Sequence, residues 1–162
     1  MISLTCMSWK ILPKEIKLRS NVEVSQKLDF TCSYLYKLSN GYNILGSYRY
    51  RFEATVINPN KYDKAGKVIT FENLKHLMSQ VVFDHCFLYN KYDDEIKFLV
   101  DSFDSLSIPT ISFDGPVSAE IILERISLRL VEVVNRYGLG AIVKCTNLRE
   151  NANSCVTWTR KD

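Results

Sequence analysis

The stretch GSYRYRFEATVI, residues 46–57, constrains the fold of this chain more than any other part of the sequence. Apolar and aromatic residues alternate there with polar and charged ones, which is typical of a β-strand that has one buried and one solvated face. One side carries Tyr48, Tyr50, Phe52, Ala54 and Val56, and the other carries Arg49, Arg51, Glu53 and Thr55. Such a strand fits an antiparallel sheet that is covered on a single face.

A second strand is predicted over residues 27–36, because KLDFTCSYLY is rich in strand-forming residues that alternate loosely. Its shared face carries Leu28, Phe30, Cys32, Tyr34 and Tyr36. The KLSNG segment, residues 37–41, has turn composition and leads toward the strand at 46–57. The chain therefore begins its ordered part with two long antiparallel strands.

Two helices follow, each with a hydrophobic stripe at helical spacing. The first is expected over residues 71–82, after a turn at Gly66, and its stripe contains Phe71, Leu74, Leu77 and Met78. The second is expected to begin at an N-cap, Ser118, and to end at Gly138. Its stripe contains Ile122, Leu123, Ile126, Leu130, Val133 and Val134.

Two further strands, residues 141–145 and 155–159, form a hairpin at the end of the chain. The order strand, strand, helix, helix, strand, strand predicts an α+β fold in which the helices lie on one face of an antiparallel sheet. Residues 91–105 are acidic and are expected to form a solvated edge, whereas residues 108–113 are a short strand or an extended segment.

The amino-acid composition limits the classes of protein to which this chain can belong. The chain has 162 residues, of which 46% are hydrophobic and 24% charged, as in a single globular domain. The net charge of +3 is spread along the sequence, which argues against a nucleic-acid partner. No window approaches the roughly 20 apolar residues of a membrane helix, so no membrane association is expected.

The cysteines indicate a reducing environment. There are five of them, an odd number, and none has the close spacing of a zinc knuckle or redox motif. The beginning of the sequence lacks a basic leader before an apolar run. A soluble, cytoplasmic protein is therefore predicted.

Three motifs in order carry a resemblance to a known family. They are GKVITFENLK at residues 66–75, FDHCFL at 83–88 and SAEI at 118–121. This arrangement resembles the 6-pyruvoyl-tetrahydropterin synthase family, which includes the bacterial 6-carboxy-tetrahydropterin synthases. The resemblance covers residues 27–162 and leaves 1–26 as an N-terminal extension, with Thr70 in place of an acid of the first motif.

The resemblance implies the tunnelling fold. In that fold a subunit contributes a four-stranded antiparallel sheet with two helices on one face, and subunits join edge to edge into a barrel. A homo-oligomer, either a trimer or a hexamer, is therefore expected. Such closure would also cover otherwise exposed sheet edges.

The family's zinc, nucleophile and substrate anchor are not matched in this sequence. Its three zinc histidines fall on Tyr34, Gly46 and Tyr48, and its catalytic cysteine falls near Tyr42. The glutamate that holds the pterin falls on Cys145, beside Thr146. Because structural and catalytic zinc sites use imidazole, thiolate or carboxylate ligands, no metal and no other cofactor is expected. The implied ligand pocket contains Tyr34, Tyr42, Tyr48, Glu120, Cys145 and Thr146.

Asp84 and His85 match the family's catalytic acid and imidazole. An aspartate beside a histidine can fix the imidazole tautomer and raise its basicity. The alternative is that the pair is a relict, with Asp84 bonded to backbone amides and His85 placed by packing. A replacement metal site from Cys32, Cys145 and an imidazole is chemically sufficient, although the spacing does not demand it.

Three functions follow from these observations. The leading hypothesis is a catalytically degenerate homologue of the pterin synthases, an oligomeric barrel that binds a pterin-like or purine-like small molecule or a protein partner. The alternative is an active pterin-converting enzyme with a zinc-independent mechanism that uses Asp84 and His85 together with Cys32 or Cys145. A third hypothesis is a structural protein that keeps only the assembly.

Overall fold

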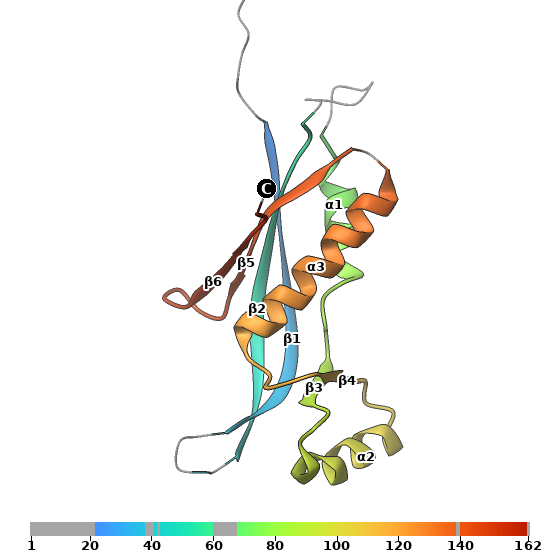
Figure 1. Ribbon diagram of the computed structural model, residues 1–162, viewed down its shortest axis with the longest axis vertical. Coiled ribbons are helices and arrows are strands. Elements are labelled where there is room, and N and C mark those ends of the chain that lie inside the picture. Colours follow the sequence, from blue (N-terminus) through green and yellow to red (C-terminus); the bar gives the residue numbers. More distant parts are fainter. Residues whose placement is uncertain (1–21, 38–40, 42, 60–67, 139, 162) are drawn as a thin grey trace, which may run out of the picture.

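A computed structural model of the chain describes residues 22–37, 41, 43–59, 68–138 and 140–161, and its elements form one mixed sheet with helices against it (Figure 1). The sheet has six strands in the order β4-β3-β1-β2-β5-β6. The strands are β1 (Glu23–Lys37), β2 (Asn43–Ile57), β3 (Cys86–Asn90), β4 (Thr110–Phe113), β5 (Ile142–Arg149) and β6 (Cys155–Thr159). The helices are α1 (Phe71–Ser79), α2 (Lys97–Ser105) and α3 (Ala119–Tyr137), with a short 3-10 turn at Asp94–Ile96.

Strands β1 and β2 form the long axis of the molecule (Figure 1). They pair antiparallel along their whole length, from Glu23 opposite Ile57 to Lys37 opposite Asn43. Both predicted strands are thus confirmed, and each is longer than its alternating pattern indicated. Pairing extends them because the backbone groups that face the neighbouring strand find their hydrogen-bond partners there.

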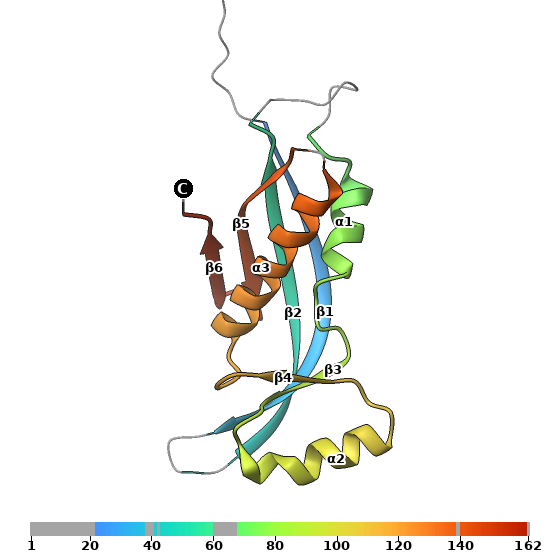
Figure 2. The same ribbon diagram turned by 45° about the vertical axis from the view of Figure 1, so that its right-hand side comes forward.

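Helices α1 and α3 cover the same face of the sheet (Figures 1 and 2). The strands contribute fully buried Phe52, and the helices contribute fully buried Leu74 and Leu130 to one continuous core. Thr70 is the N-cap of α1, where its hydroxyl accepts a hydrogen bond of 3.2 Å from the backbone N–H of Asn73. The residue that replaces an acid of the first motif therefore begins the helix as a cap.

Helix α3 has the predicted limits. The hydroxyl of Ser118 accepts a hydrogen bond from the N–H of Ile121 at its start, and Gly138 ends it with φ 72°. A positive φ is the conformation that favours glycine at a helix C-terminus. Helix α1, in contrast, ends at Ser79, three residues before the predicted end at Val82.

The segment between α1 and α3 contains a strand and a helix that the sequence did not predict, β3 and α2, whereas residues 108–113 include the short strand that was one of their two predicted alternatives, β4. Strand β3 pairs parallel with β1 at Cys32–Tyr34, and β4 pairs parallel with β3, so the sheet has six strands rather than four. The acidic residues 91–105, expected as a solvated edge, include helix α2 at the end of the molecule (Figure 2). Its apolar side packs in a small separate core that contains Phe87, Ile96 and Val100.

The remaining predictions concern the start of the chain and membranes. Of the predicted extension, residues 1–21 lie outside the described part, whereas Glu23–Gln26 belong to β1. Within the described residues, no helix has both the length and the apolar character needed to span a bilayer.

Candidate functional site

Three tyrosines gather where β1 and β2 face the helix side of the sheet, and Tyr34, Tyr48 and Tyr50 are called here the tyrosine cluster. The rings of Tyr34 and Tyr48 stack with their centroids 4.4 Å apart at an interplanar angle of 18°. The hydroxyls of Tyr34 and Tyr50 share a hydrogen bond of 2.9 Å. Tyr34 is 5% exposed and Tyr50 is 1% exposed, so their hydroxyls satisfy one another inside the protein.

The register of β1 and β2 explains the stack. Tyr34 lies opposite Gly46, and Cys32 lies opposite Tyr48, so Tyr34 and Tyr48 form a diagonal cross-strand pair. A Cβ atom on Gly46 would lie 2.5 Å from ring atoms and the hydroxyl of Tyr48. Any other residue at this position would have to displace the Tyr48 ring, because that ring occupies the space where the side chain would begin.

The buried hydroxyls are held in their neutral form. Burial is the largest cause that raises the pKa of Tyr34, although the hydrogen bond from Tyr50 opposes the rise. Burial also raises the pKa of Tyr50, and there the hydrogen bond to Tyr34 adds to the effect. Two neutral phenols in a packed stack make poor ligands for a divalent cation.

Asp84 and His85 form a tight turn that holds the edge of β1. The backbone N–H of Thr31 donates to Asp84 Oδ1 at 2.9 Å, and the N–H of His85 donates to the carbonyl of Thr31 at 2.6 Å. His85 has φ 54°, a left-handed conformation that is uncommon for residues other than glycine. Its imidazole is 82% exposed, and its Nε2 lies 3.8 Å from Asp84 Oδ2, beyond hydrogen-bond distance.

A cavity of about 250 Å³ opens beside this turn, at the junction of β1 and β3. It is called here the β1–β3 cavity. Its polar lining includes Thr31, Ser33, Ser47 and His85, and its other walls include Cys32, Cys86, Phe87 and Phe103. Pockets that bind small molecules combine apolar and aromatic walls with a few polar groups in this way.

The two thiols of this cavity lie side by side but are not activated. Cys32 is directly opposite Cys86 in the parallel pairing of β1 and β3. Burial is the main cause that raises the pKa of Cys32 to about 12, and burial also raises the pKa of Cys86. Because the thiolate is the nucleophile, a thiol with so high a pKa is almost unreactive at neutral pH.

The other residues of the predicted ligand pocket lie elsewhere in the chain. Cys145 of β5 is opposite Thr55 of β2, and Thr55 is seven residues along β2 from Tyr48, so Cys145 lies roughly 20 Å from Tyr48. Thr146 is fully buried, and its hydroxyl lies 2.6 Å from that of Ser127 in α3. Tyr42 lies outside the described residues.

Glu120 occupies the first turn of α3 and is exposed. A hydrogen bond with its N-cap, Ser118, is the largest cause that lowers the pKa of its carboxyl group. The carboxylate thus complements the positive end of the helix dipole. Within one chain, the structure brings Tyr34 together with Tyr48, but it does not bring either of them together with Glu120 or Cys145.

The replacement metal site considered above is not assembled. Cys32 has Cys86 as its neighbour rather than the distant Cys145. Among the residues that the structure describes, no three histidine, cysteine, aspartate or glutamate side chains come together in a way that could hold a metal ion.

Comparison with known proteins identifies the fold. The chain is similar to 6-pyruvoyl tetrahydropterin synthase from Plasmodium vivax, with a TM-score of 0.65, 18% identity and coverage of 88% of this chain and 99% of that chain. The enzyme from Plasmodium falciparum gives a TM-score of 0.62 at 20% identity, covering 87% of this chain and 98% of that chain. An uncharacterized protein from Wolinella succinogenes gives 0.66 at 14% identity, covering 88% and 99%.

Comparisons by sequence give no match, either to a protein-family model or to a characterised protein. The structural similarity nevertheless confirms the predicted fold, because the matched structures are covered almost completely. The chain therefore has the mixed α+β fold of the 6-pyruvoyl tetrahydropterin synthases.

The raised pKa values predict a loss of stability at alkaline pH. The unfolded chain releases protons from Cys32, Tyr34 and Tyr50 near the ordinary pKa values of these side chains, 9.0 for cysteine and 10.0 for tyrosine, whereas the native protein retains them. This contribution to stability is complete below about pH 9 and is lost as pH rises, by about 1.4 kcal/mol per pH unit for each retained proton.

The variant Tyr34→Phe/Tyr50→Phe is expected to show a shallower loss of unfolding free energy between pH 9 and 11, since two of those protons are gone. The dependence of the unfolding free energy on pH is measured by urea unfolding followed by circular dichroism at each pH. Tyr137→Phe, at an exposed position of α3, serves as control and should keep the wild-type slope. An unchanged slope in the double variant contradicts the assignment.

Proposed function

We propose that this protein is a catalytically degenerate homologue of the 6-pyruvoyl tetrahydropterin synthases that acts by binding rather than by catalysis. The observation that carries the proposal is the tyrosine cluster. At the three positions where the resemblance places zinc histidines, the chain has Tyr34, Gly46 and Tyr48, and the two rings stack 4.4 Å apart. The residues present do not fit a zinc ion, which in proteins takes imidazole, thiolate or carboxylate ligands.

The Asp84–His85 pair supports the same proposal. One carboxylate oxygen of Asp84 accepts a hydrogen bond from the backbone N–H of Thr31. This bond has a structural role at the edge of β1. The thiols offered as nucleophiles are the buried Cys32, with a pKa raised to about 12, and Cys145, which lies far along the sheet. The imidazole of His85 could act as a general base only together with a nucleophile or a Lewis acid, and the described residues place neither an activated thiol nor a group of metal ligands beside it.

We infer that the β1–β3 cavity is where a small molecule binds. A flat heterocycle such as a pterin or purine suits it, because Phe87 and Phe103 provide aromatic surface and Ser33, Ser47 and His85 provide hydrogen-bonding groups. The tyrosine cluster itself is packed and does not line this cavity, so it offers no open stacking surface there. A protein partner is the second candidate for the binding function, and a cytoplasmic location remains part of the proposal.

The active-enzyme alternative has one observation in its favour. His85 keeps a left-handed backbone, and its exposed imidazole lines the β1–β3 cavity. Strained backbone is often retained at functional sites. The proposal and this alternative therefore differ in whether a substrate bound there is converted.

The sheet edges support an assembly of subunits. In β1, only Cys32–Tyr34 pair with β3, and β6 is the last strand of the sheet at its other side. Unpaired edges of this kind offer backbone groups to another strand. We propose that subunits join edge to edge into a closed barrel of three chains, or into a pair of such barrels.

Zinc content tests the proposed loss of the metal site. Protein expressed with added zinc and purified without chelator should contain far less than one zinc per chain by mass spectrometry. The triple variant Tyr34→His/Gly46→His/Tyr48→His should gain close to one zinc, because it supplies three imidazoles at adjacent register positions.

Gly46→His alone is the matched control. It should bind no zinc and should be less stable than wild type, since its Cβ would lie 2.5 Å from the Tyr48 ring. Near-stoichiometric zinc in the wild-type protein contradicts the proposal.

Ligand binding and turnover separate a binding protein from an enzyme. The wild-type protein is expected to leave a pterin triphosphate and dihydroneopterin unconverted, while a saturating pterin or purine base raises its Tm by several degrees. Ser47→Phe, which fills the β1–β3 cavity from an exposed position, should abolish that increase. Conversion of a pterin that disappears in His85→Ala supports the enzyme instead, and the absence of any Tm increase argues against a small-molecule ligand.

The mass of the protein in solution tests the assembly. Size-exclusion chromatography with light scattering at micromolar concentration should give the mass of three or six chains of 18.7 kDa each. The mass of one chain over the whole concentration range contradicts edge-to-edge closure.

A further inference from the structure

The face of the sheet opposite α1 and α3 carries a cavity of about 360 Å³ that the proposed function does not use. It lies where β1, β2 and β5 meet the start of the β5–β6 loop. Three arginines line it, namely Arg49, Arg51 and Arg149, together with the carboxylates of Asp29 and Glu150. It is called here the arginine pocket.

The cross-strand register places like charges side by side in this pocket. Arg51 of β2 lies directly opposite Arg149 of β5 on one side and opposite Asp29 of β1 on the other. Like charges directly opposite one another destabilise a sheet. The placement of Arg149 beside Arg51 therefore does not stabilise the fold, and a bound anion would relieve the repulsion between the two side chains.

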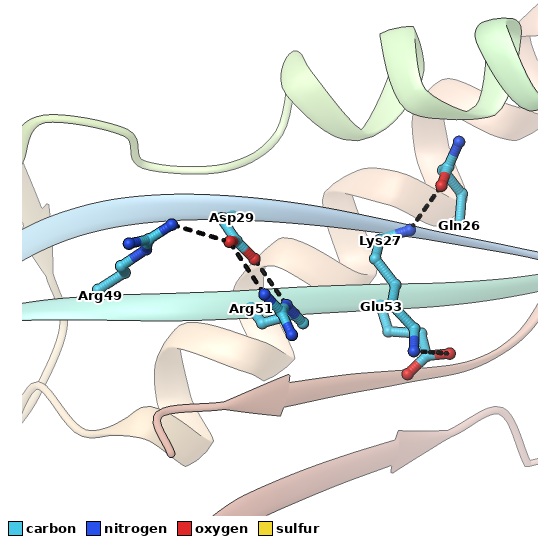
Figure 3. Close-up of polar contacts among 6 residues, drawn as sticks. All are labelled: Gln26, Lys27, Asp29, Arg49, Arg51 and Glu53. Atoms are coloured by element: carbon cyan, nitrogen blue, oxygen red, sulfur yellow. Dashed lines mark hydrogen bonds and ion pairs between the residues drawn. The ribbon is translucent and has the colours of Figure 1, made fainter. Parts of the chain in front are cut away.

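The carboxylate of Asp29 is already shared between two of the arginines. Asp29 accepts hydrogen bonds from Arg51 Nε at 2.8 Å and Nη2 at 3.2 Å, and from Arg49 Nη2 at 3.1 Å (Figure 3). These bonds, with that from Arg51 as the largest cause, lower the pKa of Asp29, so it stays ionised. The side chain of Arg149 has no hydrogen bond or ion pair with any residue that the structure describes.

Glu150 also lines the pocket, directly after Arg149, but the structure shows no hydrogen bond or ion pair between their side chains. The pocket therefore presents three guanidinium groups and two carboxylates, and its ion pairs among the described residues join Asp29 to Arg49 and Arg51.

The ion pairs of Asp29 position the arginines more than they stabilise the fold. The side chains of Arg49 and Arg51 are 77% and 56% exposed, and Asp29 is 32% exposed. Ion pairs in such exposed settings contribute little to stability. They do, however, hold two planar guanidinium groups on a rigid pair of strands, with donors still directed to solvent.

We propose that the arginine pocket binds the phosphate groups of a small molecule. Guanidinium groups form paired hydrogen bonds with phosphate oxygens, and their charge persists at any physiological pH. A chain of two or three phosphates carries enough charge to satisfy Arg149 as well as the arginines already shared by Asp29. The pocket is open to solvent, and its volume of about 360 Å³ suits a compact anion.

The test is calorimetric titration of the full chain with tripolyphosphate in a buffer of low ionic strength, where surface charges are least screened. Saturable binding is expected, and Arg149→Gln should weaken it by about tenfold or more, the usual loss for a charge-assisted contact. Arg49→Gln should weaken it as well. Circular dichroism and Tm confirm that each variant is folded.

Lys27→Gln is the matched control. It removes one positive charge from the same face of the sheet, but Lys27 pairs with Glu53 at 3.8 Å and does not line the pocket (Figure 3). This variant should bind tripolyphosphate within about twofold of wild type.

Three results would overturn the proposal: no binding at millimolar tripolyphosphate, an equal loss in Lys27→Gln and Arg149→Gln, or citrate bound as tightly as tripolyphosphate. The first result would mean that the site does not exist. The second would mean that binding depends only on the overall positive potential of this face of the sheet, and the third that the site does not prefer phosphate. None of these results bears on zinc or on the β1–β3 cavity, so this inference and the proposed function can fail separately.

Discussion

The antiparallel register of β1 and β2 is the constraint on which the rest of this structure depends. Once Tyr34 lies opposite Gly46 and Cys32 opposite Tyr48, the Tyr34 and Tyr48 rings are brought into stacking distance on one face. The same register places Asp29 opposite Arg51 on the other face. A shift by one residue would exchange the two faces and expose the aromatic side chains, so burial of the core stabilises this register strongly. Both candidate sites therefore come from a single pairing.

The two faces of that pairing favour different chemistry. The helix-covered face carries the packed tyrosine cluster, where burial raises the pKa of Tyr34 and of Tyr50 and so favours their neutral forms. The charged side chains of the uncovered face are exposed to solvent, so the guanidinium groups of Arg49 and Arg51 are accessible. The fold is that of the pterin synthases, whereas the two sites proposed for this chain, the β1–β3 cavity and the arginine pocket, depend on the particular residues that it places on that fold.

The structural role of Asp84 shows how a sequence motif and its geometry can diverge. The motif predicts an acid that assists an imidazole, yet the carboxylate binds the Thr31 amide and the imidazole extends into solvent. The pairing of Cys32 with Cys86 was likewise not predicted, because it depends on the parallel contact of β1 with β3. Short strand β3 and helix α2 were missed for the same reason. Their segments are stabilised by tertiary contacts with β1 and with one another, and their local patterns are weak.

The sequence by itself determined the features that depend on local periodicity and end signals. These include both long strands, the caps Ser118 and Gly138 of α3, the final hairpin and the placement of the helices on one face of the sheet. The absence of imidazoles at positions 34, 46 and 48 was also readable directly from the chain. Only the tertiary structure decided which side chains meet: the Tyr34–Tyr50 hydrogen bond, the ring above Gly46, the neighbouring thiols and the three arginines around one cavity. Those contacts join residues far apart in sequence, and their register depends on packing that no single segment contains.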